Sequence, residues 1–307
     1  MGPLQMTKYQ SFMARVAAGE RILIDGATGT EIERRGVPQL DKAWNGGGAL
    51  SHPDILRQVH LDYIHAGAEV VISNTFATHL HALKDAGEAD HFRAYNTRGV
   101  ELAREAVDQS GQADALVAGG ISYWSWAGGE TIAEELGAPA VQQAQFMADA
   151  GADFLILEMM VDIPRMEVTL DAAMQAGLPV WVGLSCEPDE TGRMCLLNGD
   201  PLSDTIRLLA SKKIDAIAIM HTEVEYVADC LDIVAEHWSG PVCVYAHSAR
   251  WVNNKTFFDG TISAPDYADY AKGWLDQGVQ IIGGCCGMGV DHIEALRPLV
   301  AKDQTNE

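Results

Sequence analysis

The sequence predicts a single-domain α/β protein folded as a (β/α)8 barrel, also called a TIM barrel. Eight short apolar runs rich in β-branched residues alternate with longer amphipathic stretches along the chain. The runs are apolar throughout, as in strands that are buried on both faces. Eight strands that alternate with helices indicate a parallel sheet that closes on itself. We place this domain at residues 1–307, with the barrel core at about 20–300.

The predicted strands are the apolar runs at residues 21–26, 69–76, 115–122, 153–159, 179–186, 215–221, 241–247 and 279–286. Proline at the start and glycine at the end mark four helices, at about 52–66, 139–150, 164–177 and 265–278. The rival fold is a doubly wound open sheet, which normally carries a glycine-rich phosphate loop after its first strand. The segment Gly26-Ala27-Thr28-Gly29-Thr30 lacks that spacing. The longest irregular stretches, about 34–51 and 122–138, follow strands, on the face where barrel active sites lie.

Composition excludes several classes of partner. The chain carries 21 basic and 43 acidic residues, a formal net charge of -22, and no basic cluster, which argues against nucleic acid. No apolar run approaches the roughly 20 residues that cross a bilayer, and the N-terminus lacks a secretory signal. We therefore expect a cytoplasmic protein that acts on small molecules and whose six cysteines form no disulfide framework. The sequence does not define an oligomeric state, and a homo-oligomer is compatible with it.

Polar residues follow nearly every predicted strand. The carboxyl ends of barrel strands meet on one face, so these residues should form one ring around a candidate active site. In strand order they are Asp25, Asn74 and Thr75, Ser122, Glu158, Cys186, His221, His247, and Cys285 with Cys286.

The segment Ile281-Ile282-Gly283-Gly284-Cys285-Cys286-Gly287 predicts a metal site. Neighbouring side chains on an ideal strand point to opposite faces, but the flanking glycines relax the backbone so that both sulfurs can turn toward one ion. With His221 they supply three ligands of the kind zinc prefers and leave a fourth position open. The alternative for the pair is a role as small buried apolar residues. Core positions are the expectation for Cys230 and Cys243, and for Cys186 and Cys195 a metal role is disfavoured.

Two further groups point to a cationic ligand. Asp25 and Glu158 end buried strands, where an unpaired charge is costly, so we expect them to meet a ligand's positive group. The alternative for each is an internal ion pair or a helix cap. Aromatic faces attract quaternary ammonium and sulfonium groups. Aromatic residues gather in the same loops, with Trp44 and Trp124 as the strongest candidates: Trp44, Phe76, Tyr123, Trp124, Trp126 and Trp251.

These residues resemble the homocysteine S-methyltransferase family, which includes the betaine– and S-methylmethionine–homocysteine methyltransferases. The resemblance covers about residues 20–300. It is carried by IDGATGTEIERRG near the start, AW at 43–44, HPDILRQVHLDYIHAGAEVVISNTF at 52–76, DFLILEMM, NGDPL at 198–202, and IIGGCCG with HI at 292–293.

The resemblance implies a barrel with a zinc site built from the paired cysteines and a third cysteine after the sixth strand. It also implies that Asp25 and Glu158 receive the amino group of homocysteine. The backbone near Gly26 and Ala27 and the Thr75 region would hold its carboxylate, and Trp44 would line the methyl-donor side.

Two departures from the family pattern stand out. Met220-His221-Thr222 places a histidine where the family has its third cysteine, and Tyr245-Ala246-His247-Ser248 replaces the usual tyrosine-proline-asparagine turn. A zinc ion with two thiolates and a neutral imidazole carries no net charge, whereas three thiolates leave one negative charge. We expect a lower pKa for the bound thiol and a less nucleophilic thiolate. His247 is either a neighbour of the metal ligands or a substrate contact.

The sequence thus predicts a zinc-dependent S-methyltransferase. A small sulfonium or quaternary ammonium donor would give its methyl group to a zinc-bound thiol such as homocysteine, which becomes methionine. One alternative is a zinc-dependent hydrolase that uses His221 and His247, although neither residue belongs to an H-x-H or H-E-x-x-H pattern. The other is a non-catalytic or divergent barrel that binds zinc or thiols.

Overall fold

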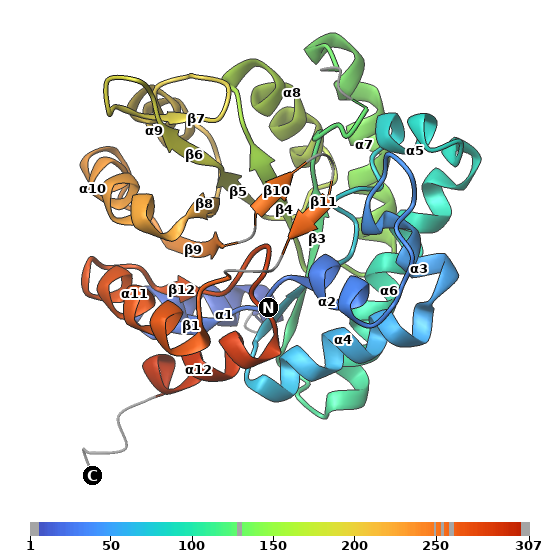
Figure 1. The fold of residues 1–307 in the computed structure, drawn as a ribbon, viewed down its shortest axis with the longest axis horizontal. Coiled ribbons are helices and arrows are strands. Elements are labelled where there is room, and N and C mark those ends of the chain that lie inside the picture. Colours follow the sequence, from blue (N-terminus) through green and yellow to red (C-terminus); the bar gives the residue numbers. More distant parts are fainter. Residues whose placement is uncertain (1–5, 128–130, 249, 253–254, 258–260, 302–307) are drawn as a thin grey trace, which may run out of the picture.

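The computed structural model describes residues 6–127, 131–248, 250–252, 255–257 and 261–301, and shows a barrel of eight parallel strands ringed by helices (Figure 1). The strand order is β1-β12-β9-β8-β5-β4-β3-β2, and a parallel bridge between Ile24 and Val70 joins the two ends. The predicted fold and its eight strands are confirmed. The strands are β1 (Ile22–Leu23), β2 (Val70–Ile72), β3 (Leu116–Ile121), β4 (Phe154–Met160), β5 (Val180–Leu184), β8 (Ala216–Glu223), β9 (Val242–His247) and β12 (Ile281–Ile282).

The outer helices bury one apolar face each against the strands. They are α4 (Pro53–Ala66), α6 (Phe92–Ser110), α7 (Ala133–Asp149), α8 (Ile163–Met174), α9 (Leu202–Ala210), α10 (Val227–His237), α11 (Ala264–Asp276) and α12 (Val290–Val300). Gly67 ends α4 in the left-handed conformation, as the sequence predicts. Within the described residues, none of the helices combines the length and the apolar character needed to span a membrane.

The predicted start of one helix at Pro139 is wrong. Helix α7 begins at Ala133, and Pro139 lies inside it. The preceding residues Ala133, Glu134, Glu135 and Leu136 favour a helix strongly, and the two acidic residues suit its first turn. These local preferences outweigh the lost backbone hydrogen bond of the proline. The stretch 122–138 is therefore partly helical, and 34–51 contains the short helices η1 (Asn45–Gly47) and α3 (Gly48–Ser51).

Helix α1 (Lys8–Ala17) closes the amino-terminal end of the barrel. Tyr9 is buried there, with its ring 5.3 Å from that of Phe154 at the start of β4. Its hydroxyl donates a hydrogen bond to Asp215 (2.8 Å) and accepts one from the indole of Trp181 (2.8 Å). Access to the barrel is therefore from the carboxyl ends of the strands.

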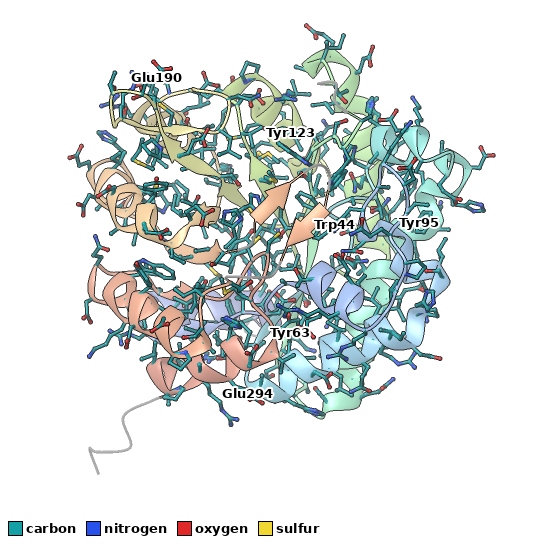
Figure 2. The ribbon with its side chains drawn as sticks, viewed as in Figure 1. Trp44, Tyr63, Tyr95, Tyr123, Glu190 and Glu294 are labelled. Atoms are coloured by element: carbon teal, nitrogen blue, oxygen red, sulfur yellow. The ribbon has the colours of Figure 1, made fainter. Side chains whose placement is uncertain are left out.

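Two hairpins follow barrel strands at that open end. One consists of β6 (Cys186–Pro188) and β7 (Met194–Leu196), and the other of β10 (Arg250–Val252) and β11 (Lys255–Phe257). In Figure 1, β10 and β11 are drawn across the centre of the barrel. Figure 2 shows Glu190 and Glu294 at the rim of the molecule and Trp44 nearer to its centre.

Candidate active site

A pocket of about 260 Å³ opens at the carboxyl ends of the strands. Most of the residues that the sequence singles out line it, whereas Asp25 and Thr75 do not. The predicted site residues in its wall are Gly26, Ala27, Trp44, Trp124, Glu158, His221, His247, Cys285 and Cys286. Residues that the sequence did not single out for the site also line it, among them Thr28, Gly29, Ser73, Met159, Leu197, Met220 and Tyr245.

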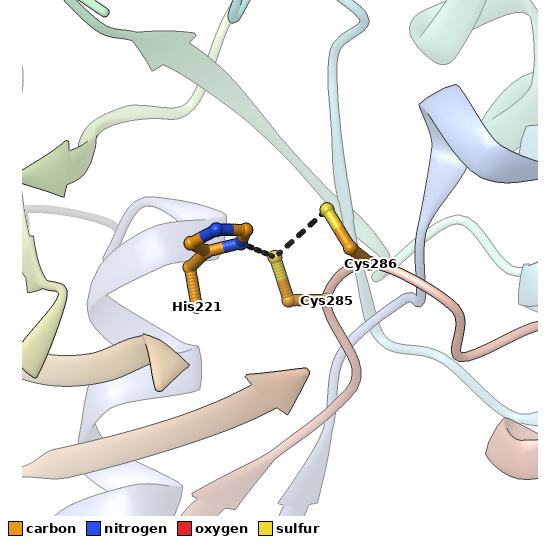
Figure 3. A group of neighbouring side chains, drawn as sticks. All are labelled: His221, Cys285 and Cys286. Carbon is orange, nitrogen blue, oxygen red and sulfur yellow. Dashed lines mark hydrogen bonds between the residues drawn. The ribbon is translucent and has the colours of Figure 1, made fainter. Parts of the chain in front are cut away.

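His221, Cys285 and Cys286 meet at one side of this pocket (Figure 3). Their donor atoms all lie within 4.8 Å of one another, and they form the one such group of three among the described residues. The Cys285 sulfur is 3.7 Å from Nδ1 of His221 and 4.0 Å from the Cys286 sulfur. In a tetrahedral zinc site, these separations are about 3.6 Å for nitrogen to sulfur and about 3.8 Å for two sulfurs. The donor set and its spacing therefore fit zinc.

Backbone hydrogen bonds fix the cysteine pair beyond the end of β12. Gly284 donates to the carbonyl of Asp25 (3.1 Å) on one side, and Cys285 donates to the carbonyl of Ala246 (2.9 Å) on the other. A Cβ atom on Gly284 would collide with the side chain of Met288. The segment is thus held between the chain after β1 and the end of β9. A larger residue at Gly284 would displace the backbone and, with it, the two sulfurs.

Two β-bulges direct site residues into the pocket. The register of β8 against β9 shifts between Met220 and Glu223, and His221 within this shift has a left-handed φ of 45°. The register of β4 against β5 shifts between Leu157 and Met160, next to Glu158. Bulges re-aim side chains and are frequent beside active sites. Here they break the strict alternation of side chains on two strands.

The two carboxyl groups predicted to meet a cation are buried close to each other. Burial, together with the neighbouring Cys286, raises the pKa of Glu158 to about 8, although the Tyr245 hydroxyl opposes the rise. Asp25 is 1% exposed, and one oxygen accepts a hydrogen bond from the Ile72 backbone (2.8 Å). Burial and the charge of Glu158 raise the pKa of Asp25 well above its ordinary value. Asp25 therefore lies just behind the pocket wall that contains Glu158.

Glu158 should make stability depend on pH in the metal-depleted protein. Between the ordinary carboxyl pKa of 4.5 and the folded value of about 8, the unfolded chain is ionised while the folded chain retains the proton. Rising pH therefore reduces the free energy of unfolding across this window, by roughly 3–5 kcal/mol in all. We expect Glu158→Gln to remove that decline and to exceed the parent in stability above pH 8.

Urea unfolding at several pH values checks this expectation. Glu190→Gln is the matched control because Glu190 is exposed in the turn between β6 and β7, and it should leave the profile of the parent unchanged. Parallel profiles for the parent and Glu158→Gln would contradict the expected effect of burial.

His247 lies beside the cysteine–histidine group. Its ring centroid is 4.0 Å from that of His221, and Nε2 is 3.2 Å from a carboxylate oxygen of Glu223. Burial alone would lower the pKa of His247, but Cys286 and Glu223 together raise it to about 9. Glu223 is not among the site residues that the sequence predicts. Glu223 lies two residues after His221, a spacing that places two side chains on the same face of a regular strand. The bulge between them breaks this pattern, so the sequence alone does not show which way Glu223 points.

Aromatic rings form another wall of the pocket. The ring centroids of Trp44 are 6.3 Å from Phe76 and 6.2 Å from Trp126, and Phe76 and Trp126 are 5.7 Å apart. A Cβ atom on Gly29 would collide with the Trp44 ring, so glycine is needed beneath it. Trp124 also lines the pocket.

Tyr123, another member of the predicted aromatic group, stands apart from this wall. Tyr123 is buried, and its hydroxyl accepts a hydrogen bond from the Val161 backbone (2.9 Å). The side chain of Trp251 lies outside the described residues.

Thr75 does not reach the pocket with its side chain. It is fully buried, and its hydroxyl donates to the carbonyl of Gly120 (2.7 Å). Its neighbours Ser73 and Asn74 line the pocket instead. Ser73 and Asn74 are thus the polar residues that this region presents to the pocket.

The cysteines outside the pair are buried. Cys230 lies in α10 and Cys243 in β9, as expected for core residues. Cys186 and Cys195 lie in the β6–β7 hairpin, and the Cys195 sulfur is 3.8 Å from a carboxylate oxygen of Asp189. None of the four lines the pocket.

Comparisons with known proteins agree with this geometry. A family model described as homocysteine S-methyltransferase matches residues 22–300. Homocysteine S-methyltransferase of Escherichia coli K12 is 30% identical, with 90% of this chain and 94% of that protein covered. Selenocysteine methyltransferase of Astragalus bisulcatus is 24% identical over 94% and 95% of the two chains. The metallated crystal structure of the E. coli homocysteine methyltransferase MmuM matches with a TM-score of 0.77, at 26% identity over 93% and 98%.

Proposed function

Because this chain belongs to the homocysteine S-methyltransferase family, we propose that it moves a methyl group from a small onium donor to a thiol. The thiol is homocysteine or a close relative, and the product from homocysteine is methionine. The donor is a sulfonium or a quaternary ammonium compound. The observation that carries this proposal is the group formed by His221, Cys285 and Cys286 in the wall of the pocket.

These three residues would hold zinc, and Glu158 and Asp25 would receive the amino group of the thiol substrate. When bound there, zinc would supply the Lewis acidity that keeps a substrate sulfur deprotonated at neutral pH. Glu158 lines the same pocket as the two cysteines, and its carboxylate is desolvated. Burial disfavours the ionised form of these carboxyl groups, and a substrate ammonium group would stabilise that form by pairing with it. The pocket thus offers complementary groups to the sulfur and to the amine.

The aromatic wall would hold the methyl donor. Trp44, Phe76 and Trp126 present ring faces and edges within about 6 Å of one another, which suits a compact cation.

The substrate sulfur attacks the methyl carbon, a carbon–sulfur bond forms, and the bond from that carbon to the onium atom breaks. The electron pair of the broken bond stays with the donor, which leaves as a neutral thioether or amine. Alignment of the two substrates in one pocket supplies much of the rate enhancement.

His221 distinguishes this site from the three-cysteine pattern that the resemblance implies. An imidazole in place of a thiolate removes one negative charge from the site. The substrate thiol should then lose its proton more easily and attack less strongly.

The six cysteines are all free, which supports a cytoplasmic location for the enzyme.

Variants at His221 test the metal site directly. We expect the parent, purified without oxygen, to hold about one zinc per chain. His221→Ala should lose most of the zinc, whereas His221→Cys should retain it. Metal analysis by mass spectrometry measures both, and transfer of a methyl group from S-methylmethionine to homocysteine measures activity. A parent that binds no zinc when it is supplied would overturn the proposed mechanism.

A further inference from the structure

The aromatic wall of the pocket is assembled from three separate segments of the chain. Trp44 directly precedes η1, Phe76 follows β2, and Trp124 and Trp126 follow β3. Residues 123–127 belong to no helix or strand, so the hydrogen bonds of the barrel sheet do not fix the position of these two tryptophans. Contacts between the three segments therefore set the spacing of the rings.

His79 joins two of these segments. Its Nε2 is 2.8 Å from the backbone carbonyl of Trp124, and its Nδ1 accepts a hydrogen bond from the backbone N–H of Ala82 (3.4 Å). A carbonyl only accepts and a backbone N–H only donates, so the neutral tautomer with its proton on Nε2 satisfies both partners. His79 is 5% exposed, and burial lowers its pKa to about 4, which keeps the ring neutral at physiological pH. Both ring nitrogens are thus engaged by the protein itself.

Histidine has a specific advantage at this position. His79 is the N-cap of α5 (Leu80–Asp85), where serine, threonine, asparagine or aspartate is more usual. Those short side chains could accept from Ala82, but their polar atoms lie too close to the backbone to reach Trp124. The imidazole carries a second nitrogen on the far side of its ring. His79 therefore caps the helix and bonds to the neighbouring loop at the same time.

The segment that carries His79 is also tied to the third part of the wall. The side-chain amide of Asn74 donates to the backbone carbonyl of Asn45, the residue after Trp44 (2.8 Å). The chain from Asn74 to His79 therefore connects the Trp44 segment at one end with the loop of Trp124 at the other. His79 is the side chain that makes the second connection.

We propose that His79 is a positioning residue for the methyl donor, because it holds the loop of Trp124 and Trp126 against the segment of Phe76. This inference rests on the proposed function, since it presupposes that the aromatic wall receives an onium cation. A ring attracts a cation effectively only within about 6 Å of its centroid. The Phe76 and Trp126 centroids are 5.7 Å apart, so a displaced loop would leave the cation in contact with one ring fewer. His79 itself is not among the residues that line the pocket.

Two amide substitutions separate the roles of the ring nitrogens. His79→Gln places an N–H donor near the position of Nε2, whereas His79→Asn keeps an acceptor near the position of Nδ1 and loses the donor to Trp124. With S-methylmethionine and homocysteine, His79→Asn should raise the KM for S-methylmethionine about 5- to 20-fold, and His79→Gln should change it less than about 2-fold. Zinc content, kcat and the KM for homocysteine should keep the values of the parent in both variants.

Binding of trimethylsulfonium to the full-length protein, followed by tryptophan fluorescence, measures the same effect without turnover. His79→Asn should weaken this binding by a factor similar to its change in KM. His79→Ser, which also keeps an N-cap and lacks the donor, should behave in the same way. His81→Ala is the matched control, because His81 lies in the same helix but contacts the carbonyl of Glu135 in α7 (3.3 Å), and its affinity should equal that of the parent.

The outcomes distinguish this inference from the proposed function. Unchanged binding of the cation by His79→Asn, or an equal rise in KM for both substrates, would overturn the role of His79. A parent that binds the cation but transfers no methyl group would contradict the proposed function alone, and the binding comparison would still decide the role of His79. A parent that binds no onium cation would overturn both.

Discussion

Cys285→Ser and Cys286→Ser are expected to lose bound zinc and to slow methyl transfer by at least about 10³-fold. The two sulfurs lie 4.0 Å apart and supply two of the three ligands. Serine keeps the size of the side chain but is a poor ligand for zinc, which prefers thiolate and imidazole. Metal analysis and the initial rate of methionine formation measure the two losses.

Cys195→Ser is the control for these variants. Cys195 is also buried, but it lies in the β6–β7 hairpin near Asp189, away from the pocket wall. Its zinc content and rate should stay close to those of the parent. If either pair variant kept its rate after treatment with a chelator, thiol activation by zinc would be wrong.

The second large effect is expected for Glu158→Gln, which should lower kcat/KM for homocysteine by about 30- to 1000-fold. Loss of one partner in a buried charge pair costs about 2–4 kcal/mol, mostly because the other charge is left unpaired. The same substitution is expected to stabilise the metal-depleted fold above pH 8. One carboxyl group would thus lower stability and support binding.

A thiol without an amino group provides the control. With 4-mercaptobutanoate, the parent and Glu158→Gln should react at similar rates, because no ammonium group is present to pair with the carboxylate. An equal loss with both thiols would show that Glu158 acts on something other than the substrate amine.

The sequence predicted the barrel well because each buried strand appears as a continuous apolar run. It also predicted most of the pocket wall, since the carboxyl ends of barrel strands converge. Residues such as Glu158, His221 and Cys285 could be found in this way because each follows or ends a recognisable strand.

Other parts depend on contacts between distant residues and could not be predicted locally. Glu223 pairs with His247 only through the register of β8 and β9 across a bulge. Thr75 follows a predicted strand, but its hydroxyl binds the backbone of β3 instead of facing the pocket. Proline usually lies at the start of a helix, but Pro139 lies inside α7 because the strong helix formers before it begin the helix earlier. In each case, tertiary packing outweighed a local pattern.

The closure of the barrel by α1 has a consequence for biosynthesis. Tyr9 is translated early, yet its partners Trp181 and Asp215 follow 172 and 206 residues later. At about 5–20 residues per second, the ribosome needs roughly 10–40 s to supply them. During that interval the apolar face formed by Tyr9, Phe12 and Val16 lacks part of the native surface that covers it. The nascent chain therefore presents a site for chaperones or for aggregation until most of the barrel has been made.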